Sequence, residues 1–353
     1  LVGSEMCIRD RDRTDEFYMN RCLKLAANGL GNTYPNPFVG SVIVHNQNII
    51  GEGFTSFYGG PHAEVNAIHS VEKKELLPSS TLYVTLEPCA HFGKTPPCSD
   101  LIIEHKIPRV VVGCLDPFAL VNGEGINRMR THGIEVSVGI LEKECLELNR
   151  RFFTFHQKKR PYVILKWAQT ANGYFAPKNH TQQWISNRFS KQLVHWWRTQ
   201  EQAIMVGKNT AIVDNPQLNS RLVQGRNPIR VLIDYDLSTP TTHYLFDQTL
   251  PTIIFNKVKG GKNELIEYIH LQSKENNLEE ILRILYQKNI QSIIIEGGSR
   301  TLQTFIEQNL WDEARVFSSS TVWEDGIFAP HLHKKPSKTQ IIYNDFLRIY
   351  RND

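Results

Sequence analysis

The sequence predicts two successive α/β domains. In the first half, apolar runs of strand length alternate with helical stripes, and a second alternation begins at Pro161. Between the two, a helical pattern over residues 141–156 leads into the polar, basic stretch 157–161. An alternation of this kind favours a sheet covered by helices. The chain has 353 residues, which is enough for two domains of the usual ~100–200 residues each.

Composition and charge are those of an ordinary globular enzyme, with 41% hydrophobic and 22% charged residues. The net charge of +4 gives no reason to expect a nucleic-acid-binding surface, and no apolar run approaches the ~20 residues of a membrane span. The six cysteines do not look like a disulfide framework, so a reducing cytoplasm fits. We expect a homo-oligomer, and we expect residues 1–13 to be a disordered or non-native tail.

The first domain is expected to cover residues 14–157. A helical stripe from Phe17 to Ala26 ends near two glycines, and the turn at residues 45–48 joins two strands into a hairpin. The elements that follow the first helix are strand 39–44, strand 49–54, helix 62–71, strand 81–86, helix 99–105, strand 109–114, helix 125–132, strand 134–138 and helix 141–156.

The motif Pro-His-Ala-Glu at residues 61–64 carries the chemistry together with Cys89 and Cys98, each of which follows a proline. A histidine, a glutamate two residues later and two distant cysteines are the signature of the catalytic zinc site of base deaminases. Two thiolates and one imidazole leave a tetrahedral Zn²⁺ one open position for water, whose pKa the metal lowers. Glu64 is then available to move protons to the ring and to the departing ammonia. The proline suits the first turn of a helix, so His62 and Glu64 would project from its start.

Ordinary explanations exist for each part of this pattern. His-x-Glu pairs are common on surface helices, and two separate cysteines can be buried thiols. The combination favours zinc, because both cysteines follow prolines, a strand-like run at residues 81–86 leads in, and the polar loop between them carries Gly93 and Lys94.

With these residues in view, the first domain resembles the deaminase domain of the bifunctional deaminase–reductases of bacterial riboflavin biosynthesis. The eight-residue loop between the cysteines is the most specific feature, because many other base deaminases have only two residues there. The matching stretches are Pro35-Asn36-Pro37 with Val39-Gly40, Pro61 to Val65, Thr85 to Cys89, and Gly93 to Cys98.

The resemblance implies a cytidine-deaminase-like α/β/α sandwich and a role for each motif residue. His62, Cys89 and Cys98 would bind Zn²⁺, and Glu64 would be the proton shuttle. Asn36 would hydrogen-bond the pyrimidine, a role in which the wrong base leaves the amide unpaired. Lys94 would contact the substrate. A plain turn residue at position 36 and a solvated loop lysine are the alternatives. The family often has a histidine where this chain has Thr55.

The second domain is expected to cover residues 158–353. Its elements are strand 161–168, helix 187–200, strand 203–207, strand 230–234, strand 252–255, helix 278–287, strand 292–296 and helix 302–308. The strand at 292–296 opens through Gly297 and Gly298 into a helix, and a helix N-terminus of this kind can hold phosphate. The pattern is not GxGxxG, so a Rossmann domain is not indicated, and a glycine turn without a ligand is equally compatible.

This half resembles the reductase domain of the same family, whose fold is similar to that of dihydrofolate reductase. The matching stretches are Lys166 to Gly173, Gln183 to Ser186, Arg198, Thr210 to Arg221, Arg230 to Asp234, and Glu296 to Gly298. The resemblance implies that NADPH is bound by Ala168, Trp184, Thr210, Asp214, Gly298, Ser299, Arg300 and Thr301. It implies that the substrate is bound by Gln182, Arg198, Leu218, Arg221 and Glu296, with Lys166 as a further contact.

Two positions depart from the family. Asn172 stands where aspartate is usual, and Gln182 stands where a small hydroxyl residue is common. A neutral amide keeps a turn and a hydrogen bond but cannot act as a carboxylate. The arginines suit a ribose phosphate, because their planar fork matches phosphate oxygens, whereas surface salt bridges are the alternative. Trp184 could also be a core residue, and NADH remains open beside NADPH.

The resemblance implies two steps on one phosphorylated pyrimidine. The first is hydrolytic deamination of 2,5-diamino-6-ribosylamino-4(3H)-pyrimidinone 5′-phosphate. The second is NADPH-dependent reduction of the ribosyl side chain, which gives 5-amino-6-ribitylamino-2,4(1H,3H)-pyrimidinedione 5′-phosphate. Three alternatives remain: a nucleic-acid-editing deaminase, which the mild charge disfavours; a structural zinc module, which usually has four protein ligands; and a deaminase fused to a failed reductase, for which Asn172 is the motive.

Overall fold

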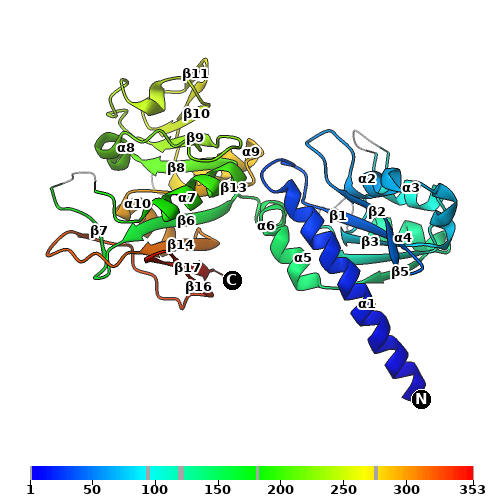
Figure 1. Cartoon of the computed structure of the whole chain (residues 1–353). Coiled ribbons are helices and arrows are strands. Elements are labelled where there is room, and N and C mark those ends of the chain that lie inside the picture. Colours follow the sequence, from blue (N-terminus) through cyan, green and yellow to red (C-terminus); the bar gives the residue numbers. More distant parts are fainter. Residues whose placement is uncertain (1, 93–95, 118–122, 180–182, 274–276, 353) are drawn as a thin grey trace. The chain divides into compact units, whose positions relative to one another are not determined.

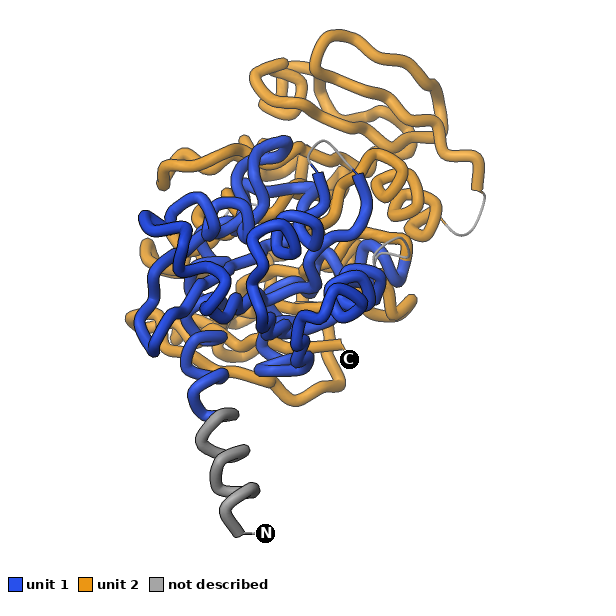
Figure 2. The backbone as a smooth tube through the Cα atoms, turned by 90° about the vertical axis from the view of Figure 1, so that its right-hand side faces the viewer, with its two compact units in different colours: residues 1–158 blue, residues 159–353 orange. Residues whose placement is uncertain are grey.

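The computed structural model describes residues 2–92, 96–117, 123–179, 183–273 and 277–352, with side chains from Arg13 onward. The chain divides into two compact units, residues 1–158 and residues 159–353 (Figure 2). Each unit contains its own sheet, which agrees with the expected pair of α/β domains.

Unit 1 is built on a five-stranded sheet with the order β2-β1-β3-β4-β5 (Figure 1). β1 pairs antiparallel with both β2 and β3, whereas β3, β4 and β5 run parallel. The strands are β1 (Gly40–His45), β2 (Asn48–Phe54), β3 (Thr81–Leu86), β4 (Arg109–Cys114) and β5 (Glu135–Val138).

Helices cover both faces of this sheet, as the α/β/α expectation requires. α1 and α5 pack on one side, and α2 packs on β2 and β1 with α3 and α4 beside it. Two glycines permit this packing: a Cβ on Gly40 would lie 2.0 Å from the Cys22 carbonyl oxygen of α1, and one on Gly53 would lie 2.4 Å from the Ala67 nitrogen of α2. The helices are α1 (Val2–Ala26), α2 (Ala63–Ser70), α3 (Cys98–Glu104), α4 (Glu124–Thr131), α5 (Glu142–Leu148) and α6 (Arg150–Lys158), with two short 3₁₀ turns, η1 (Ala27–Gly29) and η2 (Lys74–Ser79).

Three local features of unit 1 differ from the sequence expectation. Helix α1 begins at Val2, inside the segment expected to be a disordered or non-native tail, since extending a helix that is already packed costs little. The proline at 61 precedes the helix instead of opening it, because His62 is the N-cap of α2. The single helix expected over 141–156 is interrupted at the buried Asn149, whose side chain accepts a hydrogen bond from the Phe38 N–H and donates one to the Phe38 carbonyl oxygen, both at 2.8 Å.

Unit 2 is built on a ten-stranded sheet with the order β11-β12-β10-β9-β8-β13-β6-β14-β17-β16. The seven strands from β12 to β14 in this order are parallel, and the outer strands pair antiparallel. The strands are β6 (Tyr162–Gln169), β8 (Ala203–Gly207), β9 (Ile229–Ile233), β10 (Thr252–Asn256), β11 (Gly261–Asn263), β12 (Ile266–His270), β13 (Ser292–Ile295), β14 (Glu313–Ser318), β16 (Lys338–Ile342) and β17 (Asp345–Arg351), with β7 (Tyr174–Ala176) and β15 (Ile327–Phe328) in a separate ribbon.

Separate apolar clusters cover the two faces of the central strands of unit 2. On one face, the largest cluster contains Leu278, Ile281, Leu302 and Phe305 of α9 and α10. On the other, α7 contributes Val194 and Trp197 to a second cluster, and α8 contributes to a third. The helices are α7 (Arg188–Gln200), α8 (Lys208–Asp214), α9 (Asn277–Gln287) and α10 (Ser299–Glu307), with the 3₁₀ turn η3 (Tyr244–Phe246).

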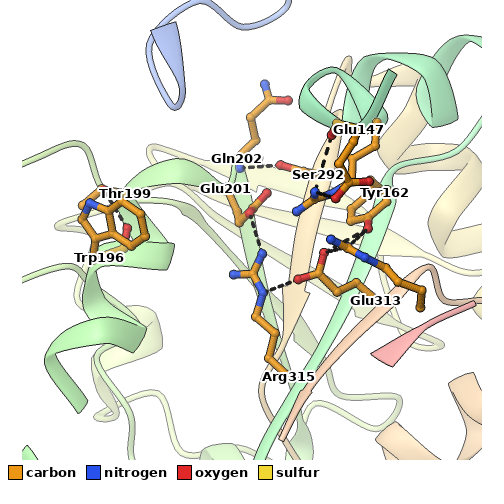
Figure 3. A network of polar contacts seen from close by, with 11 residues as sticks. Glu147, Tyr162, Trp196, Thr199, Glu201, Gln202, Ser292, Glu313 and Arg315 are labelled. Atoms are coloured by element: carbon orange, nitrogen blue, oxygen red, sulfur yellow. Dashed lines mark hydrogen bonds and ion pairs between the residues drawn. The ribbon is translucent and has the colours of Figure 1, made fainter. Parts of the chain in front are cut away.

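A buried polar network fixes the end of α7 to the sheet (Figure 3). Arg315 donates from Nε to Glu313 at 2.6 Å and forms an ion pair with Glu201 at 3.6 Å. Tyr162 donates its hydroxyl to the other Glu313 oxygen at 3.0 Å. The Arg315 guanidinium also lies 4.5 Å from the ring centroid of Trp197, the residue before Arg198. The network therefore links the helix that carries Arg198 to β14 and β6.

Candidate functional sites

The candidate metal site of unit 1 lies at one edge of its sheet. β1 begins where β2 and β3 end. Gly40 pairs with Phe54, and the Gly40 N–H donates to the Thr85 hydroxyl at 3.2 Å. The segments that leave or enter the sheet at this edge hold Asn36 before β1, His62 after β2 and Cys89 after β3. The topology therefore collects at one edge residues that are far apart in the sequence.

His62, Cys89 and Cys98 form one cluster, with their potential ligand atoms all within 4.8 Å of one another. The His62 Nδ1 lies 3.7 Å from the Cys89 sulfur and 3.3 Å from the Cys98 sulfur. Donors that share a tetrahedral Zn²⁺ at the usual bond lengths stand about 3.5–3.8 Å apart, so this donor set and its spacing fit zinc. The three ligands come from the N-cap of α2, the loop after β3 and the first residue of α3.

Hydrogen bonds within the cluster shift the pKa values of the two thiols in opposite directions. A hydrogen bond from the Cys98 thiol lowers the pKa of Cys89 to about 4, and the same hydrogen bond raises the pKa of Cys98. The Cys98 backbone N–H also donates to the Cys89 sulfur at 3.3 Å. The hydrogen bond to Cys89 raises the pKa of His62. The cluster therefore favours a thiolate at Cys89, the form in which sulfur binds metal.

Glu64 lies in the first turn of α2 and is only 3% exposed. Burial raises the pKa of its carboxyl group to about 7, even though the neighbouring His62 acts to lower it. A carboxyl group in this environment exchanges a proton near neutral pH, as general acid–base catalysis requires.

The other sequence-predicted residues of unit 1 are placed unevenly. Asn36 is half-buried, and within the part of the chain that the structure describes no hydrogen bond engages its side-chain amide. Thr55 is buried and its hydroxyl accepts a hydrogen bond from the Val39 N–H at 3.1 Å, so it serves the start of the sheet. Lys94 lies outside the described residues.

Glu87 is a further residue of this site to which the sequence analysis assigned no role. Its carboxylate is 4% exposed and accepts hydrogen bonds from the N–H groups of Asp116, Gly123 and Gly125 at 3.3, 2.9 and 3.1 Å. Burial raises the pKa of Glu87. Its position two residues before Cys89 is the only signal the sequence offers, because its partners are 29, 36 and 38 residues away.

The candidate substrate site of unit 2 lies at the carboxyl ends of parallel strands, the usual ligand edge of such sheets. Ile295 of β13 pairs with Leu165 of β6 and Met205 of β8, so Lys166 and Glu296 are neighbours just beyond. The Lys166 Nζ lies 3.7 Å from the Glu296 carboxylate.

Arg198 of α7 completes this group. Its Nε and Nη2 donate to the two Glu296 oxygens at 3.0 and 2.8 Å, and its Nη1 donates to the Asn219 carbonyl oxygen at 2.8 Å. Burial acts to raise the pKa of Glu296, but Arg198 and Lys166 outweigh it and hold the pKa at about 2. Burial lowers the pKa of Lys166. The site therefore contains a fixed carboxylate and two cations.

Arg221 and Leu218 lie on the loop that carries Asn219. Arg221 is exposed and donates to the Asn219 side-chain oxygen at 2.8 Å, which places it beside the Arg198 contact. Leu218 has its side chain in the apolar core and a left-handed backbone with φ of 50°. Its side chain is therefore committed to packing, and only its backbone is left to meet a substrate. Gln182 lies outside the described residues.

Three of the residues expected to bind NADPH form one tight group. Thr210, Gly298 and Thr301 meet at the start of α10. A Cβ atom added to Gly298 would lie 3.6 Å from the Thr210 hydroxyl and 3.5 Å from the Thr301 hydroxyl. Gly298 has a φ of 59°, which favours glycine. The Ser299 hydroxyl donates to the Phe328 carbonyl oxygen at 3.0 Å.

The remaining members of that set come from several elements. Ala168 is half-buried near the end of β6, Asp214 is the last residue of α8, and Arg300 is exposed in the first turn of α10. Trp184 is 64% exposed with the Lys191 ammonium 3.7 Å from its ring centroid, so it is a surface residue and the core alternative is wrong.

Asn172 joins two loops of unit 2. Its amide donates to the Trp323 carbonyl oxygen at 2.7 Å and accepts from the Trp323 N–H at 3.3 Å and from the Thr170 hydroxyl at 2.9 Å. An amide can make all three bonds, whereas an ionised carboxylate at this position could only accept. The asparagine therefore matches its local contacts.

His195 is a second residue that the sequence analysis missed. It lies on α7 one turn before Arg198, is 2% exposed, and its Nδ1 has no hydrogen-bond partner among the described residues. Burial, together with Arg198 and Arg221, lowers its pKa to about 4, so the ring is neutral at ordinary pH.

Among the described residues, no helix combines the length and apolar composition that crossing a bilayer requires.

Comparison with known proteins divides the chain in the same way. Residues 12–114 match the cytidine and deoxycytidylate deaminase zinc-binding region, and residues 161–323 match the RibD C-terminal domain. The chain therefore joins a deaminase domain of the zinc-binding type to a reductase domain.

The whole-chain relatives agree. Riboflavin biosynthesis protein RibD of Aquifex aeolicus is 41% identical over 318 residues and covers 89% of each chain, and that of Escherichia coli is 32% identical with 86% of this chain and 87% of the relative covered. A Thermotoga maritima structure, described as a diaminohydroxyphosphoribosylaminopyrimidine deaminase/5-amino-6-(5-phosphoribosylamino)uracil reductase, is 38% identical, has a TM-score of 0.88 and covers 97% of this chain and 99% of its own. The chain belongs to the RibD family of bifunctional deaminase–reductases of riboflavin biosynthesis.

Proposed function

We propose that unit 1 binds one Zn²⁺ through His62, Cys89 and Cys98 and deaminates 2,5-diamino-6-ribosylamino-4(3H)-pyrimidinone 5′-phosphate. The observation that carries this proposal is the cluster of three donor atoms within 4.8 Å of one another, with the buried Glu64 on the same helix turn as His62. Zn²⁺ with three protein ligands supplies a Lewis acid that keeps one position for water.

The residues of unit 1 then divide the work. Glu64 takes a proton from the attacking water and returns protons to the ring nitrogen and the departing ammonia. Asn36 has an unengaged amide among the described residues, and it pairs with the edge of the pyrimidine and rejects rings with the wrong pattern. Lys94 is proposed as a further substrate contact from the intercysteine loop.

The test of the metal site is zinc content. The full chain is expected to hold one Zn²⁺, and Cys98→Ser is expected to hold much less, because the site loses a thiolate. Cys145→Ala is the matched control, since Cys145 is another buried free thiol that lies outside the cluster. Zinc content that is equal in the parent and in Cys98→Ser would refute the assignment.

Unit 2 is proposed to reduce the ribosyl group of the deaminated product with NADPH. Arg198, Arg221, Glu296 and the backbone at Leu218 hold the substrate, with Lys166 beside them and Gln182 as a further contact. The start of α10, with Gly298, Ser299, Arg300 and Thr301, holds the phosphates of NADPH, and Ala168, Trp184, Thr210 and Asp214 orient the cofactor. The hydride chemistry belongs to the cofactor, and these residues bind and orient the two reactants. The fixed Arg198–Glu296–Lys166 group supports this assignment.

A coupled assay tests both units. The diaminopyrimidinone ribotide is incubated with the full chain, with and without NADPH, and the products are weighed by mass spectrometry. Exchange of one amino group for oxygen, followed by gain of two hydrogens only with NADPH, supports both steps. Deamination without reduction, together with no NADPH binding in a titration, would support the alternative of a failed reductase. The same titration with NADH decides which nicotinamide cofactor is used.

A cytoplasmic location and a homo-oligomeric state are further parts of this proposal. Five cysteines of the described chain are free thiols, which suits a reducing compartment. The homo-oligomer stays a prediction, and sedimentation of the purified chain over a range of concentrations tests it.

A further inference from the structure

Glu87 connects three parts of unit 1 that meet at the metal-site edge. It follows the end of β3 by one residue and precedes Cys89 by two. One carboxylate oxygen, Oε2, accepts the N–H groups of both Asp116 and Gly123, and the other, Oε1, accepts that of Gly125. The same carboxylate thus holds the segment after β4 and the start of α4.

The partners of Glu87 belong to a helix N-terminus. Gly123 is the N-cap residue of α4, with φ of 91°, and a glycine has no side chain of its own with which to cap the helix. Because the first N–H groups of a helix lack partners within it, and because the helix dipole favours an anion there, a carboxylate supplied from another segment serves as the cap. Glu87 is that cap, provided from the loop that carries a proposed zinc ligand.

Close packing makes this junction rigid. A Cβ on Gly125 would lie 2.0 Å from the Pro88 carbonyl oxygen and 3.4 Å from the Glu87 Oε1. The adjacent Cys89 carbonyl oxygen accepts the Ser99 N–H of α3 at 3.1 Å. Cys89 therefore sits between two fixed points, the α4 junction on one side and α3 on the other.

We propose that Glu87 is a positioning residue for the deaminase site, which fixes the Cys89 sulfur for zinc by anchoring its loop to α4. This inference rests on the proposed zinc site. Replacing a residue that contacts and orients a metal ligand typically lowers metal affinity by about 10–100-fold. Glutamine has the shape of glutamate, but its NH₂ group would face one of the N–H donors instead of accepting from it.

The experiment compares the full chain with Glu87→Gln and with the matched control Glu104→Gln, whose side chain is exposed at the end of α3. Zn²⁺ affinity is measured by competition with a chromophoric chelator, and amide exchange of Gly123 and Gly125 is measured on the metal-free protein. Glu87→Gln is expected to bind Zn²⁺ about 10–100-fold more weakly and to exchange both amides faster. Its deaminase kcat falls with a smaller change in KM, while reductase activity of the same chain is unchanged.

A second variant covers the case in which Glu87→Gln does not fold. Gly125→Ala keeps the Glu87 carboxylate but pushes the loop at Pro88 away. It is therefore also expected to lower the affinity for Zn²⁺. Zinc affinity within twofold of the parent in Glu87→Gln overturns the inference. The inference is also overturned if Glu87→Gln fails to fold in unit 1 and Gly125→Ala binds zinc as tightly as the parent. A parent chain that binds no zinc would instead refute the proposed function.

Discussion

Arg198 and Glu296 face each other through two parallel hydrogen bonds, from Nε to Oε1 and from Nη2 to Oε2, at 3.0 and 2.8 Å. The two residues come from α7 and from the end of β13, about 100 positions apart in the chain. Both side chains are largely buried, and the third guanidinium donor is held by Asn219. The pair is therefore a fixed part of unit 2 before any ligand arrives, and its energetics can be tested in the free protein.

Replacement of Glu296 by glutamine is expected to lower the free energy of unfolding of unit 2 by about 3 kcal/mol, because Arg198 is left buried without its counter-charge. All six tryptophans lie beyond residue 158, so tryptophan fluorescence in urea reports on unit 2 alone. The control is Glu267→Gln, which breaks an exposed pair with Lys288 and should cost less than about 1 kcal/mol. Equal effects of the two substitutions would contradict the prediction.

The same pair predicts a pH dependence. The pKa of Glu296 is about 2 in the folded chain, below its ordinary value of 4.5. A depressed carboxyl pKa stabilises the fold above the unfolded value, and this stability is lost as pH falls from about 4.5 towards 2. The stability gap between the parent and Glu296→Gln should hold steady from pH 7 to 5 and shrink below. If the stability gap is unchanged at pH 3.5, the pKa of Glu296 is not lowered in the folded chain.

Glu64→Gln separates metal binding from proton transfer. The glutamine keeps the size of the side chain but cannot carry the proton, so the deaminase kcat is expected to fall about 10²–10⁴-fold. Zinc content should stay at the parental level, because Glu64 is not among the clustered donors. Reductase activity of the same preparation is the internal control. A deaminase rate within a few-fold of the parent would remove Glu64 from the mechanism.

Asn172→Asp restores the residue that is usual in the family and is nevertheless expected to weaken this chain. An aspartate cannot donate to the Trp323 carbonyl oxygen and would repel it at 2.7 Å. Because the position is exposed, the cost should be about 1 kcal/mol in the urea unfolding of unit 2. Asn172→Ala, which removes the hydrogen bonds without the repulsion, should cost less. A more stable Asn172→Asp variant would show that the amide is a defect.

The chemistry of unit 1 was predictable from sequence because it is locally encoded. His62 and Glu64 belong to one helical turn, and the cysteines sit in short motifs with their own prolines. The role of Glu87 was not predictable, since its partners at Asp116, Gly123 and Gly125 are reached only through the fold. Nothing near Asn149 signals the break in the expected helix, because Phe38, its partner, is 111 residues away.

In unit 2 the sequence predicted five parallel strands that read as largely apolar runs, β6, β8, β9, β10 and β13, and missed the others. β14 is buried throughout yet carries Glu313 and Arg315, whose charges are balanced within a group that also contains Glu201 and Arg351. The edge strand β16 is mostly exposed, so it has no apolar period to detect. Leu218 was predicted to face substrate, but its side chain is in the core.

The Asn149–Phe38 contact bears on where a stand-alone deaminase could be cut from this chain. The zinc-binding family region ends at residue 114, and a fragment with that end would contain all three donors and Glu64. It would lack Asn149, which holds the backbone between Asn36 and β1 in place. Such a fragment would carry every chemical group of the metal site while the segment that leads into the first strand is released. The shortest autonomous deaminase must therefore extend beyond Asn149.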